Sequence, residues 1–353
     1  MERVLLVLPV SGYRNQAFED AAKRNGATTW ILTEASQLAL QSPRILPFSL
    51  ERFEEERDAV VRHAMQLGID AVVGVDDRST VIATEIAHAL GLIDPTHHQG
   101  VLASLDKYLT RSRLGDAELP QPRWQLHQPT DDLIAQIEAV GGFPVVVKPR
   151  SLNQSRGVVR ADDPGSLERA VTIARESLQR CGTSDRSLLV EEYVDGVEFA
   201  IEGVLHEGYL KVLAVFDKPD PLVGPYFEES IYVVPTALSE GILREATRVV
   251  QGAVKALGLV HGPLHAELRS RVDDDRVFLI EIAPRTIGGK CGSILRFDEG
   301  RSLEEVVVAE ALGEGSHAPR RRNAPAGVLM LPTTSTGIFR GIRNLEEVQS
   351  LPG

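Results

Sequence analysis

Glu267 and Glu281 are the residues whose type and spacing most directly suggest chemistry. They lie in two apolar segments joined by the polar turn 272–275, a pattern that predicts a β-hairpin over 261–283. Each glutamate is seven residues from Asp274, so the two side chains are expected to face each other on neighbouring strands. Opposed like charges are destabilising, and a buried, uncompensated carboxylate costs several kcal/mol. A shared proton, a basic side chain or a divalent cation would remove this cost.

The ligand type favours the cation. Carboxylate oxygens on a rigid pair of strands suit Mg²⁺, which keeps waters and takes further ligands from substrate phosphates. On the hairpin alone, a buried ion pair with Arg269 or Arg285 remains an alternative. Alternation along the second strand places Glu281 on one face together with Val277, Leu279 and Ala283.

The first hundred residues must supply a scaffold, and they alternate between strand-like and helix-like segments. Strands are predicted at 4–8, 28–32 and 71–75, and helices at 15–23 and 79–90. This alternation predicts a parallel sheet covered on both faces. The turn at 9–12 holds one glycine, whereas a dinucleotide-binding turn needs three. The region is therefore expected to be Rossmann-like in shape, without evidence for NAD.

The rest of the chain has a different character. A polar segment at 94–100 predicts a boundary near residue 98, followed by a short helix from Ser104, as N-cap, to Leu114. Longer strands then follow at 144–148, 156–161, 187–193, 197–205 and 209–216, with helices at 165–180 and 239–257. The predicted fold class is an α/β portion followed by an α+β portion.

The composition limits the classes of partner. The 353 residues are enough for two or three domains, and 50 acidic against 38 basic residues give a net charge of −12. This charge argues against nucleic-acid and anionic-membrane binding, but a nucleotide needs only a few local cations and a metal. Two cysteines, Cys181 and Cys291, are too few for a disulfide framework and indicate a cytoplasmic protein. No segment approaches the roughly 20 apolar residues of a membrane span.

Several motifs in chain order resemble the ATP-grasp superfamily, from about residue 70 to beyond residue 330. They are SLDK at 104–107, FPVVVKP at 143–149, EEYVDGVEF at 191–199, the glutamate hairpin, and EIAPR at 281–285. The resemblance implies a Rossmann-like domain followed by an ATP-grasp fold of two α+β subdomains. The expected boundaries are 1–98 for the first domain, 99–190 for a linker helix and the small subdomain, 191–313 for the large subdomain, and 314–353 for the start of an incomplete C-terminal subdomain with strands at 327–331 and 337–342.

The resemblance also implies residue roles. Lys107 and Lys148 would contact the phosphates of ATP, and Lys148 and Arg285 would act in catalysis, with Arg285 facing the γ-phosphate and an acyl phosphate. Glu267 and Glu281 would hold Mg²⁺, with Mn²⁺ as an alternative. The other ATP-binding residues would come from a phosphate loop, whose backbone N–H groups can cradle an anion, and from a hinge strand: Ser151, Ser155, Arg156, Gly157, Glu191, Glu192, Tyr193, Val194 and Glu198.

One departure from the family pattern concerns the metal shell. Many relatives carry an asparagine two residues after the second metal glutamate, where this chain has Ala283. Water or phosphate oxygens would then complete the coordination shell. The segment 217–235, including Glu228, and the loop with Gly288 and Gly289 resemble the substrate side of L-amino-acid ligases and would bind substrate together with Arg285.

The function implied is an ATP-dependent carboxylate–amine ligase that acts through an acyl phosphate, in one version joining two amino acids. Its partners would be a small-molecule carboxylate and a small-molecule amine, and relatives are often homodimers. EIAPR is similar both to purine-pathway carboxylases and to L-amino-acid ligases. Two alternatives therefore stay open: a carboxyphosphate-forming carboxylase of the purine or biotin type, and a nucleotide-binding module without catalysis.

Overall fold

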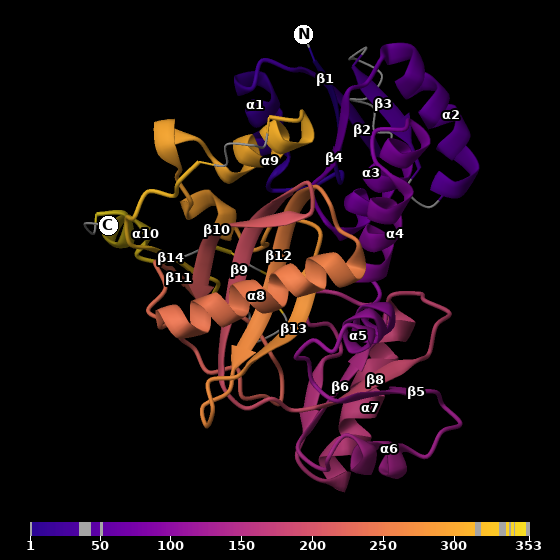
Figure 1. Ribbon diagram of the computed structural model, residues 1–353, viewed down its shortest axis with the longest axis vertical. Coiled ribbons are helices and arrows are strands. Elements are labelled where there is room, and N and C mark those ends of the chain that lie inside the picture. Colours follow the sequence, from indigo (N-terminus) through magenta and orange to yellow (C-terminus); the bar gives the residue numbers. More distant parts are fainter. Residues whose placement is uncertain are drawn as a thin grey trace.

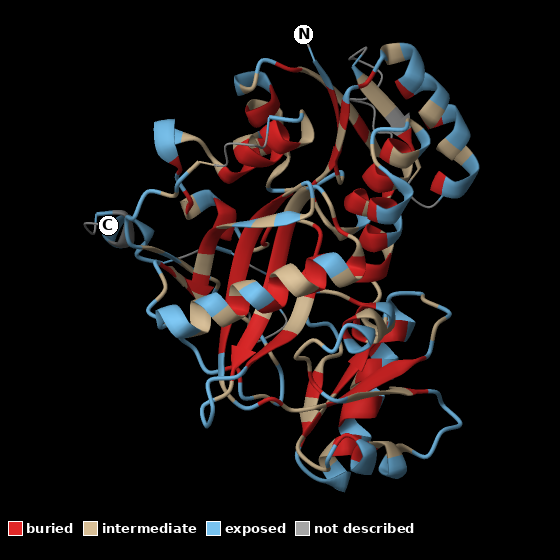
Figure 2. Cartoon of the chain, viewed as in Figure 1, coloured by how far each residue is buried: buried red, intermediate tan, exposed pale blue. Residues whose placement is uncertain are grey.

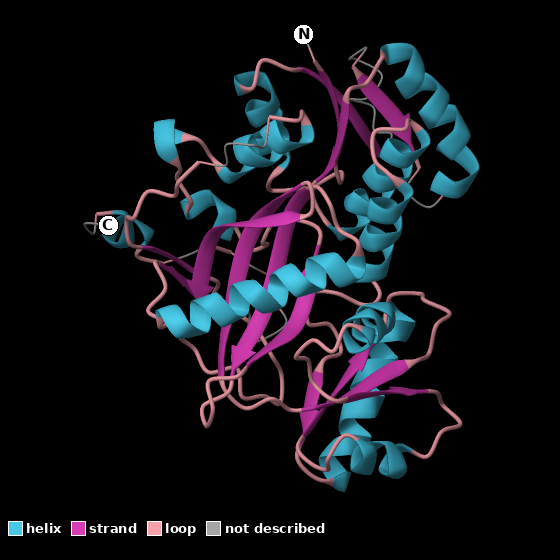
Figure 3. Ribbon diagram, in the orientation of Figure 1, coloured by secondary structure: helices cyan, strands magenta, loops and turns pink. Residues whose placement is uncertain are grey.

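Three β-sheets form the framework of the protein in a computed structural model, which describes residues 2–34, 44–49, 52–314, 319–331, 337–338, 340–341 and 343–350. Figure 1 shows a parallel sheet near the N-terminus, a large central sheet crossed by one long helix, and a small sheet at the far end of the molecule. Figure 3 shows helices beside each sheet. None of the helices in these ranges is long and apolar enough to cross a membrane.

The N-terminal sheet is parallel, as the alternating pattern predicts, with strand order β3-β2-β1-β4. Its strands are β1 (Arg3–Val7), β2 (Thr28–Glu34), β3 (Ile45–Phe48) and β4 (Ala71–Gly74), and its helices are α1 (Asn15–Arg24), α2 (Phe53–Leu67) and α3 (Asp77–Ala89). The inner strand β1 is buried from Val4 to Val7 because helices cover both faces. Sequence reasoning did not predict β3.

The connection after this sheet is helical, which corrects the expected start of the next helix. Residues 95–104 form helix α4 (Pro95–Ser104), because the side chain of Asp94 caps the N–H of His97 at 2.9 Å and Pro95 suits the first helical position. Ser104 ends α4 and is therefore not an N-cap. Asp106 caps the next helix, α5 (Lys107–Asp116), by accepting from the N–H of Tyr108 and of Leu109.

The small sheet is antiparallel and carries the predicted lysine strand. Its order is β5-β8-β6-β7, with strands β5 (Trp124–His127), β6 (Val145–Pro149), β7 (Val159–Ala161) and β8 (Leu188–Glu192). Helices α6 (Leu133–Ala139) and α7 (Pro164–Arg180) pack on it. A capping box between Asp163 and Ser166 starts α7.

The large sheet has the order β13-β12-β9-β10-β11-β14. Its strands are β9 (Val197–His206), β10 (Tyr209–Asp217), β11 (Ile231–Val234), β12 (Gly262–Ser270), β13 (Val277–Ala283) and β14 (Ala326–Leu329). Helix α8 (Glu240–Leu257) lies across one face and buries a stripe at helical spacing that includes Ala246, Val250 and Val254. Figure 2 shows the buried strands of this sheet beneath the striped helix.

The glutamate hairpin forms in the predicted register, with Glu267 paired with Glu281. A β-bulge follows, because Leu268 pairs with Leu279 and leaves Ile280 as the extra residue. The bulge shifts the alternation of β13, so Val277, Leu279 and Ile282 all lie in the core beneath α8. The prediction that Glu281 shares a face with Val277 and Leu279 is therefore wrong. Glu281 lies with Glu267 on the opposite face.

The last part of the chain packs against the N-terminal sheet and then adds a strand to the large sheet. After the short helices η2 (Cys291–Ile294) and η3 (Asp298–Gly300), helix α9 (Leu303–Ala311) places Val307 and Val308 in the core of the N-terminal sheet. Strand β14 then pairs with β11 at the edge of the large sheet, close to the strand predicted at 327–331. The strand predicted at 337–342 is absent from the described residues 337, 338, 340 and 341, while 339 and 342 lie outside the description. A short helix, α10 (Leu345–Gln349), follows.

Candidate active site

A cavity of about 70 Å³ between the small and large sheets brings together ten of the predicted site residues. They are Lys107, Lys148, Ser155, Glu191, Glu192, Tyr193, Val194, Glu198, Glu267 and Glu281. They come from α5, β6, the loop after β6, the segment from β8 to β9, β12 and β13. Six separate segments therefore converge on one space, as the order of motifs implies.

Lys148 is held by a buried carboxylate. Its Nζ lies 2.7 Å from Glu191, which also receives the guanidinium of Arg111 at 2.8 Å. Burial lowers the pKa of Lys148 to about 8, although the charge of Glu191 opposes the shift. Burial would raise the pKa of Glu191, but Arg111 and Lys148 outweigh it and hold this pKa at about 2. The three groups carry one net positive charge, which faces the cavity at Lys148.

Arg111 also holds the glutamate hairpin in place. Its Nη2 donates to the carbonyl of Ile280 at 2.7 Å, and its Nη1 donates to that of Leu279 at 3.4 Å. These carbonyls flank the bulge next to Glu281. Arg111 therefore ties β8, through Glu191, to β13 through a single buried side chain.

Glu267 and Glu281 have different surroundings. Glu267 lies 3.4 Å from the Nζ of Lys218 and 3.4 Å from the Nε2 of His265. Burial would raise the pKa of Glu281, but the positive charges of Lys107, Lys148 and Arg285 outweigh this and lower it. Neither glutamate forms the ion pair with Arg269 or Arg285 that sequence reasoning left open, because Arg269 pairs with Glu198 and Arg285 pairs with Asp77.

Glu198 is bound by two cations of the protein itself. The Nε of Arg269 donates to one of its oxygens and Lys218 to the other, each at 2.8 Å. Lys218 also contacts Glu229, so one buried ammonium lies among Glu198, Glu229 and Glu267. Burial would lower the pKa of Lys218, but these three carboxylates raise it well above its usual value.

The donor set suits a hard divalent cation. Glu281 faces Glu267 across the hairpin. Oxygens of Glu198, Glu229 and Glu267 also lie within 4.8 Å of one another, but the ammonium of Lys218 already lies among these three. Carboxylate oxygens are the ligands that Mg²⁺ takes in proteins. Ala283 is buried and offers no side-chain donor.

The phosphate loop is only partly gathered at this cavity. Ser155 lines it, while Ser151 lines a neighbouring cavity of about 220 Å³ next to Lys107. Lys107 donates to the carbonyl of Leu152 and so holds the backbone of this loop in place. Arg156 is exposed and donates to Asn153, and with Gly157 it lines a groove beside α7. The structure therefore does not bring Arg156 and Gly157 to the lysines.

Aromatic and guanidinium groups cover the cavity. The rings of Tyr193 and Phe227 stack with centroids 6.5 Å apart, and the guanidinium of Arg160 lies 4.0 Å from the Tyr193 centroid. The backbone of the loop that carries Phe227 is tied to the small sheet, because the N–H of Arg160 donates to Pro225 at 2.9 Å. This loop therefore closes over the hinge strand.

A second cavity of about 1150 Å³ adjoins the first, and Glu267 and Glu281 line both. It collects the four predicted substrate residues, Glu228, Arg285, Gly288 and Gly289. The N–H of Ile287 donates to the buried Glu202 at 3.0 Å, so this amide of the glycine loop is already engaged. Arg285 donates to Asp77 at the start of α3, and Asp77 accepts from Asn153 of the phosphate loop.

Four residues at or beside these two cavities escaped sequence reasoning. Arg14 and Asp77 line the second cavity, and Arg111 and Lys218 bind glutamates that line the first. Asp77 follows the carboxyl end of β4, the edge where ligands bind in parallel sheets, and that position was a usable signal. Lys218 stands in the quoted segment 217–235, but no spacing rule connects it to Glu198. Arg14 directly precedes α1 and Arg111 lies on α5, and an isolated arginine at such a position gives no signal.

Known proteins are similar to this chain in sequence and in fold. The pattern of a family described as the ATP-grasp domain matches residues 141–294. D-alanine–D-alanine ligase B of Chromobacterium violaceum is 28% identical over 175 residues, 48% of this chain and 54% of that protein. D-alanine–D-alanine ligase of Paracidovorax citrulli is 27% identical over 240 residues, 65% of this chain and 69% of that protein. The chain thus spans about half the length of the first relative.

A solved structure extends the similarity over nearly the whole chain. The crystal structure of L-amino acid ligase from Bacillus licheniformis superposes with a TM-score of 0.78 and 26% identity, covering 99% of this chain and 84% of that one. The match includes the N-terminal sheet as well as the two sheets that enclose the cavity. The arrangement of all three sheets is therefore shared.

Proposed function

We propose, on the premise that this chain belongs to the ATP-grasp family, that it is an ATP-dependent carboxylate–amine ligase forming an amide or peptide bond through an acyl phosphate. One observation carries the proposal: a cavity lined by two lysines and two opposed glutamates adjoins a larger cavity that holds Arg285. We assign the phosphates of the nucleotide to the edge of the smaller cavity, beside the lysines and glutamates. We assign the carboxylate and amine substrates to the larger cavity.

The chemistry explains why these charges are needed. A carboxylate does not react with an amine at neutral pH because its leaving group would be oxide, whereas an acyl phosphate releases phosphate. Bringing a carboxylate to a triphosphate costs about 4 kcal/mol per charge pair at 4 Å and an effective dielectric of 20. Lys148 and Arg285 would offset this repulsion and stabilise the charge on the transferring group.

The residues around the metal position would orient the phosphates. Glu267 and Glu281 would hold Mg²⁺, or Mn²⁺ in its place, and the ion when bound would neutralise phosphate charge. Lys107 would brace the phosphate loop, and the hinge from Glu192 to Val194 would face the base. Glu198 would reach a ribose only by exchanging its bonds to Arg269 and Lys218.

Amino acids are the proposed substrates. The second cavity carries a positive group at Arg14 and negative groups at Asp220, Glu228 and Glu229. These are the charges needed to bind a carboxylate and an ammonium group. Arg14 donates to the carbonyl of Ile287 at 2.8 Å, and its Nε and Nη2 are buried without a hydrogen-bond partner among the described residues. Two free donors of a guanidinium match a carboxylate in bidentate geometry.

The test is phosphate release from ATP with Mg²⁺ across pairs of amino acids, with product masses measured. A product one water lighter than the two substrates together supports the ligase. Glu281→Gln is expected to lower kcat/KM at least about 100-fold, while Glu168→Gln on exposed α7 should leave it unchanged. Turnover that requires bicarbonate would favour the carboxylase, and nucleotide binding without turnover for any pair would favour the non-catalytic module.

A further inference from the structure

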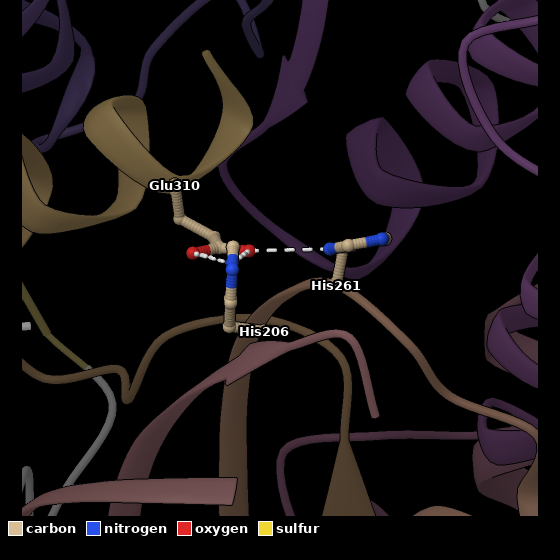
Figure 4. Close-up of side chains that lie close together, drawn as sticks. All are labelled: His206, His261 and Glu310. Atoms are coloured by element: carbon tan, nitrogen blue, oxygen red, sulfur yellow. Dashed lines mark hydrogen bonds and ion pairs between the residues drawn. The ribbon is translucent and has the colours of Figure 1, made fainter. Parts of the chain in front are cut away.

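A second group of ligand-type side chains lies away from both cavities. His206, His261 and Glu310 place their donor atoms within 4.8 Å of one another. The Nδ1 of His206 lies 3.1 Å from Glu310, and the Nδ1 of His261 lies 3.2 Å from the same Oε1. Figure 4 shows both rings turned toward the carboxylate, which descends from α9 onto the ends of the strands.

The backbone fixes the two histidines as neighbours. β9 and β12 are antiparallel partners, and Leu205 pairs with Gly262, so His206 and His261 are the next opposed positions of the same ladder. The N–H of Gly208 donates to the carbonyl of Val260 at 2.8 Å and holds the turn after β9 against the segment before β12. The rings are therefore brought together by strand pairing before any side-chain contact is made.

Glu310 is a buried carboxylate without a strong cationic partner. Its side chain is 1% exposed, and its ion pairs in the described part of the chain are with the two histidines alone. An isolated buried carboxylate is costly. The histidine side chains are 31% and 44% exposed, so the opposite side of the cluster is open to solvent. A cation could enter there and keep a water ligand.

We propose that His206, His261 and Glu310 form a binding site for a divalent transition-metal ion of the Zn²⁺ class. Two imidazole nitrogens and one carboxylate oxygen form a donor set that zinc binds, with water in the fourth position. Tetrahedral bonds of zinc to nitrogen and oxygen place neighbouring ligand atoms about 3.3 Å apart. The two nitrogen–oxygen separations in the structure, 3.1 and 3.2 Å, are close to that value. The two imidazole nitrogens distinguish this donor set from the carboxylate pair of Glu267 and Glu281. A pair of carboxylates suits harder ions such as Mg²⁺.

The ion would join parts of the chain that are far apart in sequence. Glu310 belongs to α9, whose Val307 and Val308 pack in the N-terminal sheet. The histidines belong to the large sheet. A metal bound here would therefore link the N-terminal layer to the large sheet and raise the stability of the folded chain in proportion to the logarithm of metal concentration.

The experiment is equilibrium dialysis of the full chain against Zn²⁺ in excess Mg²⁺, which occupies oxygen-ligand positions. We expect one zinc per chain. His206→Ala and His261→Ala should each weaken binding by more than about 100-fold, and His63→Ala, an exposed histidine on α2, should leave it unchanged. Glu310→Gln keeps the size of the side chain but loses the charge and should also weaken binding.

Substitution by Co²⁺ gives a second measurement that does not depend on stability. A tetrahedral site with two nitrogens should give an intense visible absorption band that is absent in His206→Ala and retained in Glu281→Gln. Absence of bound zinc from the folded wild-type chain would overturn the proposal. Zinc binding that survives both histidine substitutions, or that disappears in Glu281→Gln alone, would also overturn it, because the ion would then lie at the glutamate hairpin.

Discussion

At the residue scale, three side chains, Lys148, Glu191 and Arg111, show how a positive charge is kept available inside the protein. Two cations share one carboxylate, so the positive charge of Lys148 is not cancelled. The pKa of Lys148 is nevertheless lowered to about 8 by burial. The lysine is therefore charged at neutral pH but loses its proton far below the usual range for lysine.

This shift predicts the pH dependence of nucleotide binding. Protonated Lys148 attracts the phosphates, so affinity for ATP should be steady below pH 7 and fall by up to about tenfold per pH unit above pH 8. The free energy of unfolding of the unliganded chain should change with pH in the opposite direction. Between pH 8 and about pH 10.5, Lys148 is protonated in the unfolded chain and deprotonated in the folded chain, so stability should rise with pH in this range. Calorimetric titration with ATP measures the first effect. Lys148→Arg keeps its charge and should show no such decline; an identical profile in the variant would contradict the assignment.

Arg14 gives a second prediction at this scale. Its free Nε and Nη2 lie in the large cavity, and a hydrogen bond to a charged group contributes about 1.5–3 kcal/mol. Arg14→Met should therefore raise the KM of one amino-acid substrate about 10- to 100-fold with little change in ATP affinity. Arg62→Met, at an exposed position on α2, serves as control. Equal loss of affinity for ATP and for both substrates would instead indicate a general structural defect.

At the scale of elements, strand and helix positions followed from pattern, whereas capping and register irregularities did not. The parallel sheet and the hairpin register were predicted correctly because alternation and turn position determine them. The helix over 95–104 was missed because the polar segment 94–100 is typical of a connection, whereas Asp94 caps a helix there and Pro95 suits its first position. The faces of β13 were wrong because nothing in the run VFLIEIA marks Ile280 as a bulge.

The same limit applies to the candidate site. The lysines, glutamates and arginine could be predicted from motif order. All but Lys107, which begins α5, stand in a strand or just after one. Glu191 was placed at the hinge, but its partner Arg111 is 80 residues away on α5. Contacts of that separation depend on how the two sheets meet, which local patterns do not determine.

The loop that carries Phe227 covers the cavity. Its motion should control how much of the acyl phosphate is lost to hydrolysis. Phe227 stacks on Tyr193, and the loop backbone accepts from the N–H of Arg160 and from the side chains of Arg160 and Arg269. The ring of Phe227 is therefore the aromatic part of a cover whose backbone is held by hydrogen bonds. Phe227→Ala should loosen the cover and raise phosphate release that is not coupled to product, because closure excludes water from reactive intermediates. The ratio of phosphate to product measures this. Val223→Ala, an exposed position of the same loop, should keep the wild-type ratio, and an unchanged ratio in Phe227→Ala would contradict the role of the ring.

At the scale of the whole molecule, helix α9 connects the N-terminal sheet to the large sheet, because its side chains pack in the cores of both. Val307 and Val308 complete the core of the N-terminal sheet together with Val4, Leu6 and Phe18. The N-terminal sheet is therefore not an independent unit in its packing, although the sequence suggested a separate first domain. The boundaries expected at 98, 190 and 313 stay predictions.

Disrupting this contact should affect the first sheet most. Val308→Asp would bury a carboxylate without a partner in the N-terminal core and should cost several kcal/mol of unfolding free energy. Met65→Asp, the same kind of change at an exposed position of α2, should cost less than about 1 kcal/mol. Denaturant unfolding gives both values, and limited proteolysis shows where the chain opens. Equal effects of the two substitutions would mean that α9 contributes little to the first sheet.

The position of α9 also has a consequence for synthesis of the chain. The strands of the first sheet are made by residue 74, but the helix that covers part of it ends at residue 311. At about 5–20 residues per second, a ribosome needs roughly 12–50 s to add the residues between them. During that interval the apolar face awaiting Val307 and Val308 remains uncovered. The first sheet can therefore complete its core only after residues 307 and 308 have emerged, late in the synthesis of the chain.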